Sequence, residues 1–167
     1  MNNSRRCVNV MKAFLADTHN LTYHGVKRTI SVRRDDRNGF STDIDKNNSE
    51  IIRIYYSFKT CNEDKMFREF FISLYPAAKE FSDITIGLLH EMGHNVHRTR
   101  TFSYDRAVQI DLMRIKYDTI EELNHAYFTL PDELAATKWA VNWLKKKENR
   151  QRAREFEKEF FKAYLGA

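Results

Sequence analysis

The residues best suited to chemistry in this sequence are His90, Glu91 and His94, which stand in the pattern His-Glu-x-x-His. Residues four apart lie on one face of an α-helix, about 6 Å apart along its axis, so imidazoles from consecutive turns can reach one tetrahedral metal ion. The side chain of Glu91 then emerges beside the metal and can take a proton from an activated water. The pattern predicts a zinc ion held by His90 and His94, with Glu91 as the general base.

The flanking residues indicate that this helix is buried. It is apolar on nearly every side, through Ile84, Ile86, Leu88, Leu89, Met92 and Val96. Histidine and glutamate in such a helix need a partner or a metal ion to offset their lost hydration. A cluster of paired side chains with only a structural role is the alternative to a metal site.

The motif from His90 to His94, on a buried helix, resembles the active-site helix of the zincin superfamily of metallopeptidases. The resemblance implies a small sheet, an active-site helix and a later helix that gives the third ligand. It also implies one zinc ion per chain and hydrolysis of peptide bonds by promoted water. The metzincin subclass is excluded, because its third histidine position is Arg100 here and its glycine position is His97.

Glu133 is the expected third zinc ligand, in the gluzincin arrangement that takes a glutamate from a later helix. It shares a helix face with Thr137, Ala140 and Leu144, which are small or apolar, so a carboxylate heading that face needs a partner. A glutamate favoured by the positive end of the helix dipole is the alternative. The reserve candidates, expected on an exposed helix face, are Glu121, Glu122 and His125.

The segment from Glu133 to Ala140 also resembles the third-ligand helix of the ImmA/IrrE-like peptidases. These are small intracellular zincins, often carried by phages and mobile elements, that typically act on regulatory proteins. In that family a glutamate precedes, by four, an Asn or Asp followed by an aromatic residue and an alanine. The corresponding residues here are Glu133, Thr137, Trp139 and Ala140. Threonine replaces the usual Asn or Asp, which leaves open whether this position hydrogen-bonds a zinc ligand.

Other parts of a peptidase site are less sharply indicated. The candidate donors to a tetrahedral oxyanion are His97, Arg98, Tyr104, His125 and Tyr127. His97 lies about 4.5 Å beyond His94 along the helix, too far to join both other histidines at one ion, so it lines the cleft or is structural. A strand near 39–45 or 50–58 is expected to bind extended substrate at the edge of a sheet.

Hydrophobic periodicity predicts the elements that must position these residues. Helices are expected near 4–19, 63–75, 82–98, 104–115, 118–127, 129–147 (capped by Thr129) and 149–165, and strands near 26–34, 39–45 and 50–58. This order predicts a single α+β domain over residues 1–167. We expect a minimal zincin-like fold, with a three-stranded sheet packed on the active-site helix and a C-terminal amphipathic helix over 149–167.

Composition is that of an ordinary folded protein, with 42% apolar and 13% aromatic residues. Cys7 and Cys61 are far apart, which favours free thiols in a reducing compartment. No segment resembles a signal peptide or a membrane span. We therefore expect a cytoplasmic protein that acts on a protein or peptide and has no membrane partner.

The net charge of +5 is concentrated in the basic run 145–154. A solvated helix face is the plainer interpretation, and a tether to nucleic acid is the sharper one, weakened because no aromatic residues interleave with the cations. Two alternatives to a simple peptidase follow. One is a DNA-associated protease, and the other is a zincin-like scaffold that binds a host- or DNA-associated partner with little turnover.

Overall fold

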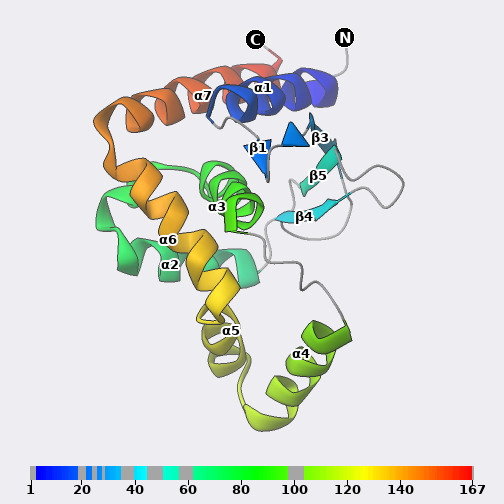
Figure 1. The fold of residues 1–167 in the computed structure, drawn as a ribbon. Coiled ribbons are helices and arrows are strands. Elements are labelled where there is room, and N and C mark those ends of the chain that lie inside the picture. Colours follow the sequence, from blue (N-terminus) through cyan, green and yellow to red (C-terminus); the bar gives the residue numbers. More distant parts are fainter. Residues whose placement is uncertain are drawn as a thin grey trace.

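The fold is built mainly from helices, which surround the region of the histidine motif (Figure 1). This computed structural model describes the backbone of residues 3–18, 22–23, 26–27, 29–34, 40–44, 51–56, 62–97 and 104–166, and the side chains of 5–15, 65–94, 96 and 108–166. The helices are α1 (Asn3–Thr18), α2 (Asn62–Leu74), α3 (Asp83–His97), α4 (Tyr104–Lys116), α5 (Ile120–Phe128), α6 (Pro131–Lys145) and α7 (Lys147–Leu165), with a 3₁₀ turn η1 (Pro76–Glu80).

Short strands occupy the chain between α1 and α2. They are β1 (Thr22–Tyr23), β2 (Val26–Lys27), β3 (Thr29–Arg34), β4 (Phe40–Ile44) and β5 (Ile51–Tyr56). Three of them pair in the order β3-β5-β4, with β3 parallel and β4 antiparallel to β5. In this order β5 is central and β4 lies at an edge, and β4 contacts α3.

The expected α+β class is wrong for the packed body of the protein. Among the residues whose side chains the structure describes, about 90% are helical and none lies in a strand. That body is all-α, rather than a three-stranded sheet packed on an active-site helix. The physical reason is that α3, apolar on nearly every side, buries its surface most extensively against another helix, α6.

The described core lies where α1, α3, α6 and α7 meet. Phe14 of α1 stacks on Phe156 of α7, with ring centroids 4.3 Å apart, and meets Trp143 of α6 edge-on at 5.9 Å. α1 and α7 lie side by side at one end of the molecule (Figure 1). On α7, Phe160 is buried while Phe161 is 40% exposed.

One predicted helix start is wrong, and one was not foreseen. Thr129 does not cap α6, because its hydroxyl donates to the carbonyls of His125 and Ala126 at the end of α5. α6 begins instead at Pro131, which suits a first helical turn because no amide hydrogen is needed there. Thr119 caps α5 and forms a capping box with Glu122.

Two cations of the basic run 145–154 make contacts with other parts of the fold. Arg150 donates to the carbonyls of Leu144 and Lys145 at the end of α6, at 3.2 and 2.9 Å. Arg154 pairs with Glu80 at 2.9 Å. These contacts give part of the run a structural role, and a nucleic-acid partner stays a prediction.

The described residues include no helix long and apolar enough to cross a membrane. Cys7 is a free, fully buried cysteine, and burial raises the pKa of its thiol. Cys61 lies outside the described residues.

Truncating Phe14 should test the helical core. We expect Phe14→Ala to lower the free energy of unfolding by about 3–5 kcal/mol, because the ring is 7% exposed and leaves a cavity against Phe156 and Trp143. Urea denaturation measures the change. Phe161→Ala, which removes the same side chain from an exposed position, should cost about 1 kcal/mol or less. Equal losses in the two variants would contradict this packing.

Candidate metal centre

The start of α3 is held by side chains from two other helices. The Glu157 carboxylate of α7 accepts hydrogen bonds from the Ser82 amide at 2.5 Å and from the Thr85 hydroxyl at 2.7 Å. Arg68 of α2 pairs with Asp83 at 3.0 Å. A carboxylate suits a helix N-terminus because it binds the unsatisfied amides there. The helix that carries the histidines is therefore fixed before the motif begins.

Gly93, inside the motif, sets the distance between α3 and α6. A methyl group added at Gly93 would lie 2.7 Å from Cα of Ala136 and 2.8 Å from its carbonyl carbon, closer than real contacts allow. The face of α6 that meets Gly93 is fully buried at Ala136, Thr137 and Ala140. Only glycine lets the two backbones come this close, and this approach brings α6 against both histidines.

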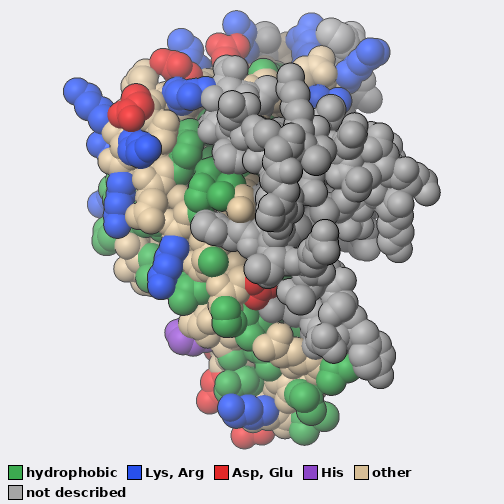
Figure 2. Space-filling view, in the orientation of Figure 1, with side chains coloured by type: hydrophobic (Ala, Val, Ile, Leu, Met, Phe, Trp, Pro, Cys, Tyr) green, Lys and Arg blue, Asp and Glu red, His purple; other side chains and the backbone are tan. Residues whose placement is uncertain are grey.

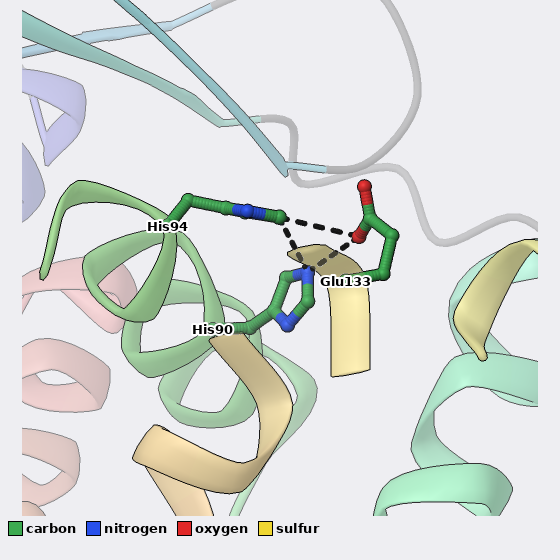
Figure 3. Close-up of side chains that lie close together, drawn as sticks. All are labelled: His90, His94 and Glu133. Carbon is green, nitrogen blue, oxygen red and sulfur yellow. Dashed lines mark hydrogen bonds and ion pairs between the residues drawn. The ribbon is translucent and has the colours of Figure 1, made fainter. Parts of the chain in front are cut away.

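Three side chains from these two helices converge on one point (Figure 3). Nε2 of His90 lies 3.1 Å from Oε2 of Glu133, and Nε2 of His94 lies 3.2 Å from the same oxygen. The two ring nitrogens are 3.0 Å apart. His90 and Glu133 are buried, and His94 is slightly more open. The expected ligands thus form a nearly equilateral triangle of potential metal-binding atoms.

The electrostatics of the triangle favour an ionised carboxylate. Burial alone would raise the pKa of Glu133, but hydrogen bonds from His90 and His94 outweigh it and hold that pKa well below its usual range. Burial alone would lower the pKa of His94. The hydrogen bond to Glu133 and the charges of Glu91, Glu133 and Asp132 outweigh that effect and raise the pKa of His94.

Protons alone cannot satisfy all three contacts. An ionised Glu133 oxygen only accepts hydrogen bonds, and each imidazole Nε2 is either a donor or an acceptor. Whatever protons His90 and His94 carry, at least one contact therefore joins two donors or two acceptors. A cation within reach of all three atoms would satisfy them together, so the donor set itself points to a metal ion.

The spacing of the triangle fits such an ion. The three groups, His90, His94 and Glu133, lie close enough to hold one metal ion. A tetrahedral zinc ion with bonds of about 2.0–2.1 Å separates its ligand atoms by roughly 3.3 Å. Adjacent ligands of an octahedral ion with similar bonds lie roughly 3.0 Å apart. The observed separations of 3.0–3.2 Å accommodate a metal ion without choosing between these geometries.

A hydrogen bond and a ring contact hold His90 in place. The Thr137 hydroxyl lies 3.1 Å from Nδ1 of His90, and Thr137 is fully buried. When Nδ1 is protonated and donates a hydrogen bond to the hydroxyl, Nε2 carries no proton, and its lone pair faces Glu133 and His94. The Phe67 ring packs against the imidazole at 4.6 Å and 60°. Threonine thus makes the hydrogen bond that the sequence left open.

Glu91 lies beside the triangle on the same helix. It is 6% exposed, it precedes His94 by three residues and therefore lies on a neighbouring part of the helix surface, and its charge is one of those that raise the pKa of His94.

The other predicted residues are not brought to the triangle by the described structure. Glu121 is exposed, and Glu122 accepts a hydrogen bond from the Thr119 amide at 3.3 Å. His125 is also exposed and packs edge-on against Phe70 at 6.1 Å. Tyr127 is partly buried on α5. His97 and Tyr104 belong to α3 and α4, but their side chains lie outside the described residues, as does all of Arg98.

Three contributors to the centre were not foreseen. Gly93 sets the helix approach, Phe67 packs on His90, and Asp132 adds charge near His94. A glycine inside a buried helix was the only signal available in the sequence, because such a residue often marks a close backbone approach.

Comparison of this chain with models of protein families, with curated proteins and with solved structures gives no match. The function must therefore be argued from the geometry of the centre.

Adding a methyl group at Gly93 should separate the two ligand helices. Alanine favours a helix over glycine by about 1 kcal/mol, so Gly93→Ala would stabilise the fold if there were space. We expect it instead to destabilise the fold by about 1–3 kcal/mol and to weaken metal binding, because the clash is with backbone. Thermal unfolding and zinc titration measure both effects.

The control is a double variant in which Ala136→Gly is added to Gly93→Ala. Ala136→Gly removes only the side chain at Ala136, while the clash involves backbone atoms, so it should not restore metal binding to Gly93→Ala. Wild-type zinc affinity in Gly93→Ala alone would show that the two helices are not fixed by this contact.

Metal affinity should rise with pH. A metal-bound His94 must be neutral, and its surroundings raise its pKa, so binding has to expel a proton. Below that pKa, each unit by which the pH is lowered should weaken the apparent affinity for zinc by about tenfold, and one proton should be released per ion bound. Calorimetry with zinc, in buffers of different ionisation enthalpy near pH 6 and near pH 8, reports the proton count. A count of zero near pH 6 would rule out His94 as a ligand.

Proposed function

We propose that this protein is a zinc-dependent peptidase that hydrolyses peptide bonds of a protein substrate. The observation that carries this proposal is the buried triangle of His90, His94 and Glu133 atoms, 3.0–3.2 Å apart, beside Glu91. Two imidazoles and one glutamate are a ligand set of catalytic zinc, and three protein ligands leave one position of a tetrahedral ion open.

The buried Glu91 favours zinc over iron. Two histidines and a carboxylate also bind iron in non-haem oxygenases, whose reaction begins with dioxygen. A carboxylate one residue after the first ligand, near His94, suits instead a reaction that begins by removing a proton from water.

The chemistry divides between the ion and the chain. When bound, zinc polarises the substrate carbonyl and lowers the pKa of an attacking water to about 7. Glu91 accepts a proton from that water while the water oxygen adds to the carbonyl carbon. It then gives the proton to the amine nitrogen as the carbon–nitrogen bond breaks. Thr137 keeps the His90 tautomer and ring orientation constant throughout.

Among the described strands, β4 offers a substrate backbone an edge that lies against α3. Of the two strands expected to bind substrate, β5 is central and already paired on both sides, whereas β4 is at the edge and contacts α3. We propose that an extended substrate segment adds to β4 and passes the metal centre. The resemblance to ImmA/IrrE-like peptidases supports an intracellular regulatory protein as that substrate, and the free, buried Cys7 thiol fits the cytoplasmic location expected from the sequence.

The proposal predicts that substituting a metal ligand removes the zinc, whereas substituting Glu91 keeps the zinc and slows turnover. Elemental analysis should find about one zinc per chain in the wild type and in Glu91→Gln, and little in His94→Ala and Glu133→Ala. Glu91→Gln should also cleave fluorescein-labelled casein or a quenched-fluorescence peptide library about 10²–10⁴-fold more slowly, because it lacks the base.

The matched metal content of Glu91→Gln and wild type is the control for that rate. Iron in place of zinc in the wild type would contradict the peptidase. Wild-type cleavage by Glu91→Gln would contradict the general base, and zinc retained in Glu133→Ala would contradict the third ligand.

A further inference from the structure

A groove runs between α4, α5 and the start of α6. It has a volume of about 770 Å³, within the size range of ligand pockets. Its apolar lining consists of Leu112, Met113, Tyr117, Ala126, Leu130 and Pro131. Lys116, Glu121 and Glu122 add charges to it. The metal centre uses none of these side chains.

Exposed apolar side chains gather on the same part of the molecule. Leu112 is 61% exposed, Ile115 82% and Ile120 53%. Figure 2 shows hydrophobic side chains over the lower end of the molecule, where Figure 1 places α4 and α5. Exposed apolar side chains clustered in this way mark binding surfaces more often than scattered ones do.

The charge of this region is opposite to that of the chain. Residues 104–132, which leave out the metal ligand Glu133, contain six acidic and three basic residues, a net charge of −3 in a chain of +5. One of the three cations, Arg114, pairs with one of the carboxylates, Asp111, at 3.1 Å, which leaves the net charge unchanged. Glu121 in the groove is exposed, and Asp118 and Asp132 nearby are exposed as well. The groove therefore suits an apolar side chain flanked by cations.

The groove and the metal centre meet at the start of α6. Pro131 lines the groove, and Glu133 follows it by two residues on α6. A series of ring contacts also connects them: His125 in the groove meets Phe70 at 6.1 Å, and Phe70 meets Phe128 at 5.6 Å. Phe128 then meets Phe67 at 5.3 Å, and Phe67 meets the ligand His90 at 4.6 Å. The start of α6 therefore borders the groove and also carries a ligand of the centre.

We propose that this groove is the docking site for the substrate polypeptide of the metal centre. It selects segments in which an apolar side chain is flanked by lysine or arginine. The role of the bound segment as a substrate rests on the proposed peptidase function, whereas the binding preference of the groove does not.

Binding is tested with zinc-loaded, full-length Glu91→Gln and three fluorescein-labelled peptides of 12 residues. One carries a Leu-Phe pair flanked by lysines, the second has glutamates in place of the lysines, and the third has serines in place of Leu-Phe. By fluorescence anisotropy, the lysine-flanked Leu-Phe peptide should bind at least about tenfold more tightly than either of the others.

Two groove variants and one distant control locate the binding. Leu112→Ser and Glu121→Lys, each in the same background, should weaken binding of that peptide by about tenfold. Lys158→Glu, an exposed charge change on α7, should leave it unchanged. Melting temperatures of the variants show whether each is folded. With Glu91 restored and a cleavable peptide, Glu121→Lys should raise KM and leave kcat unaltered.

The outcomes separate the two proposals. Equal affinity for the lysine- and glutamate-flanked peptides, or unchanged binding in both groove variants, would overturn the docking site and leave the peptidase proposal standing. A wild-type dimer that Leu112→Ser dissociates, by light scattering, would assign the groove to a second copy and also overturn it. Selective peptide binding by a protein that takes up no zinc would overturn the peptidase, and with it the substrate role, but not the binding preference.

Discussion

The close approach of α3 and α6 at Gly93 is the constraint on which the centre depends. A side chain at Gly93 would overlap the backbone of Ala136. On α3, His90 precedes Gly93 by three residues and His94 follows it directly; on α6, Glu133 and Thr137 stand in the same way about Ala136. Any increase in the helix separation would lengthen both edges of the ligand triangle that join the α3 histidines to Glu133 on α6. Glu157 and Arg68 hold the start of α3, the helix that carries both histidines.

A buried triangle of two imidazoles and a carboxylate is costly to the protein when protons are its only cations. Part of the lost hydration is recovered by the contacts between the three groups, yet one contact is always frustrated. Such a cluster is weak evidence for stability and better evidence for a function that needs it. The hydrogen bond between the Thr137 hydroxyl and Nδ1 of His90 also serves a function rather than stability, because it orients a ring whose other nitrogen faces the ligand triangle.

Whether a feature of this structure can be predicted from the sequence depends on how far apart along the chain the interacting residues are. The spacing of His90 and His94 follows from local helix geometry and can be seen in the sequence. Glu133 could also be predicted, because a lone carboxylate on a face of small and apolar residues needs a partner. The contact between Gly93 and Ala136 joins residues 43 positions apart, and no local pattern reports it. The α+β expectation failed because alternating residues before α2 indicated strands but not which elements bury the core. The capping error at Thr129 arose because a hydroxyl before a helix can equally bond back to the helix before it.

The path of the chain between His94 and Glu133 has a consequence for how such a protein can diversify. The chain leaves the metal centre at the end of α3, forms α4 and α5, and returns to the same centre at the start of α6. α4 contacts mainly α5, so this excursion is attached to the body largely through α5 and its own two ends. The surface of α4 and α5 could therefore change by mutation or exchange while His90, His94 and Glu133 keep their positions. Recognition and chemistry would then evolve on separate stretches of one chain.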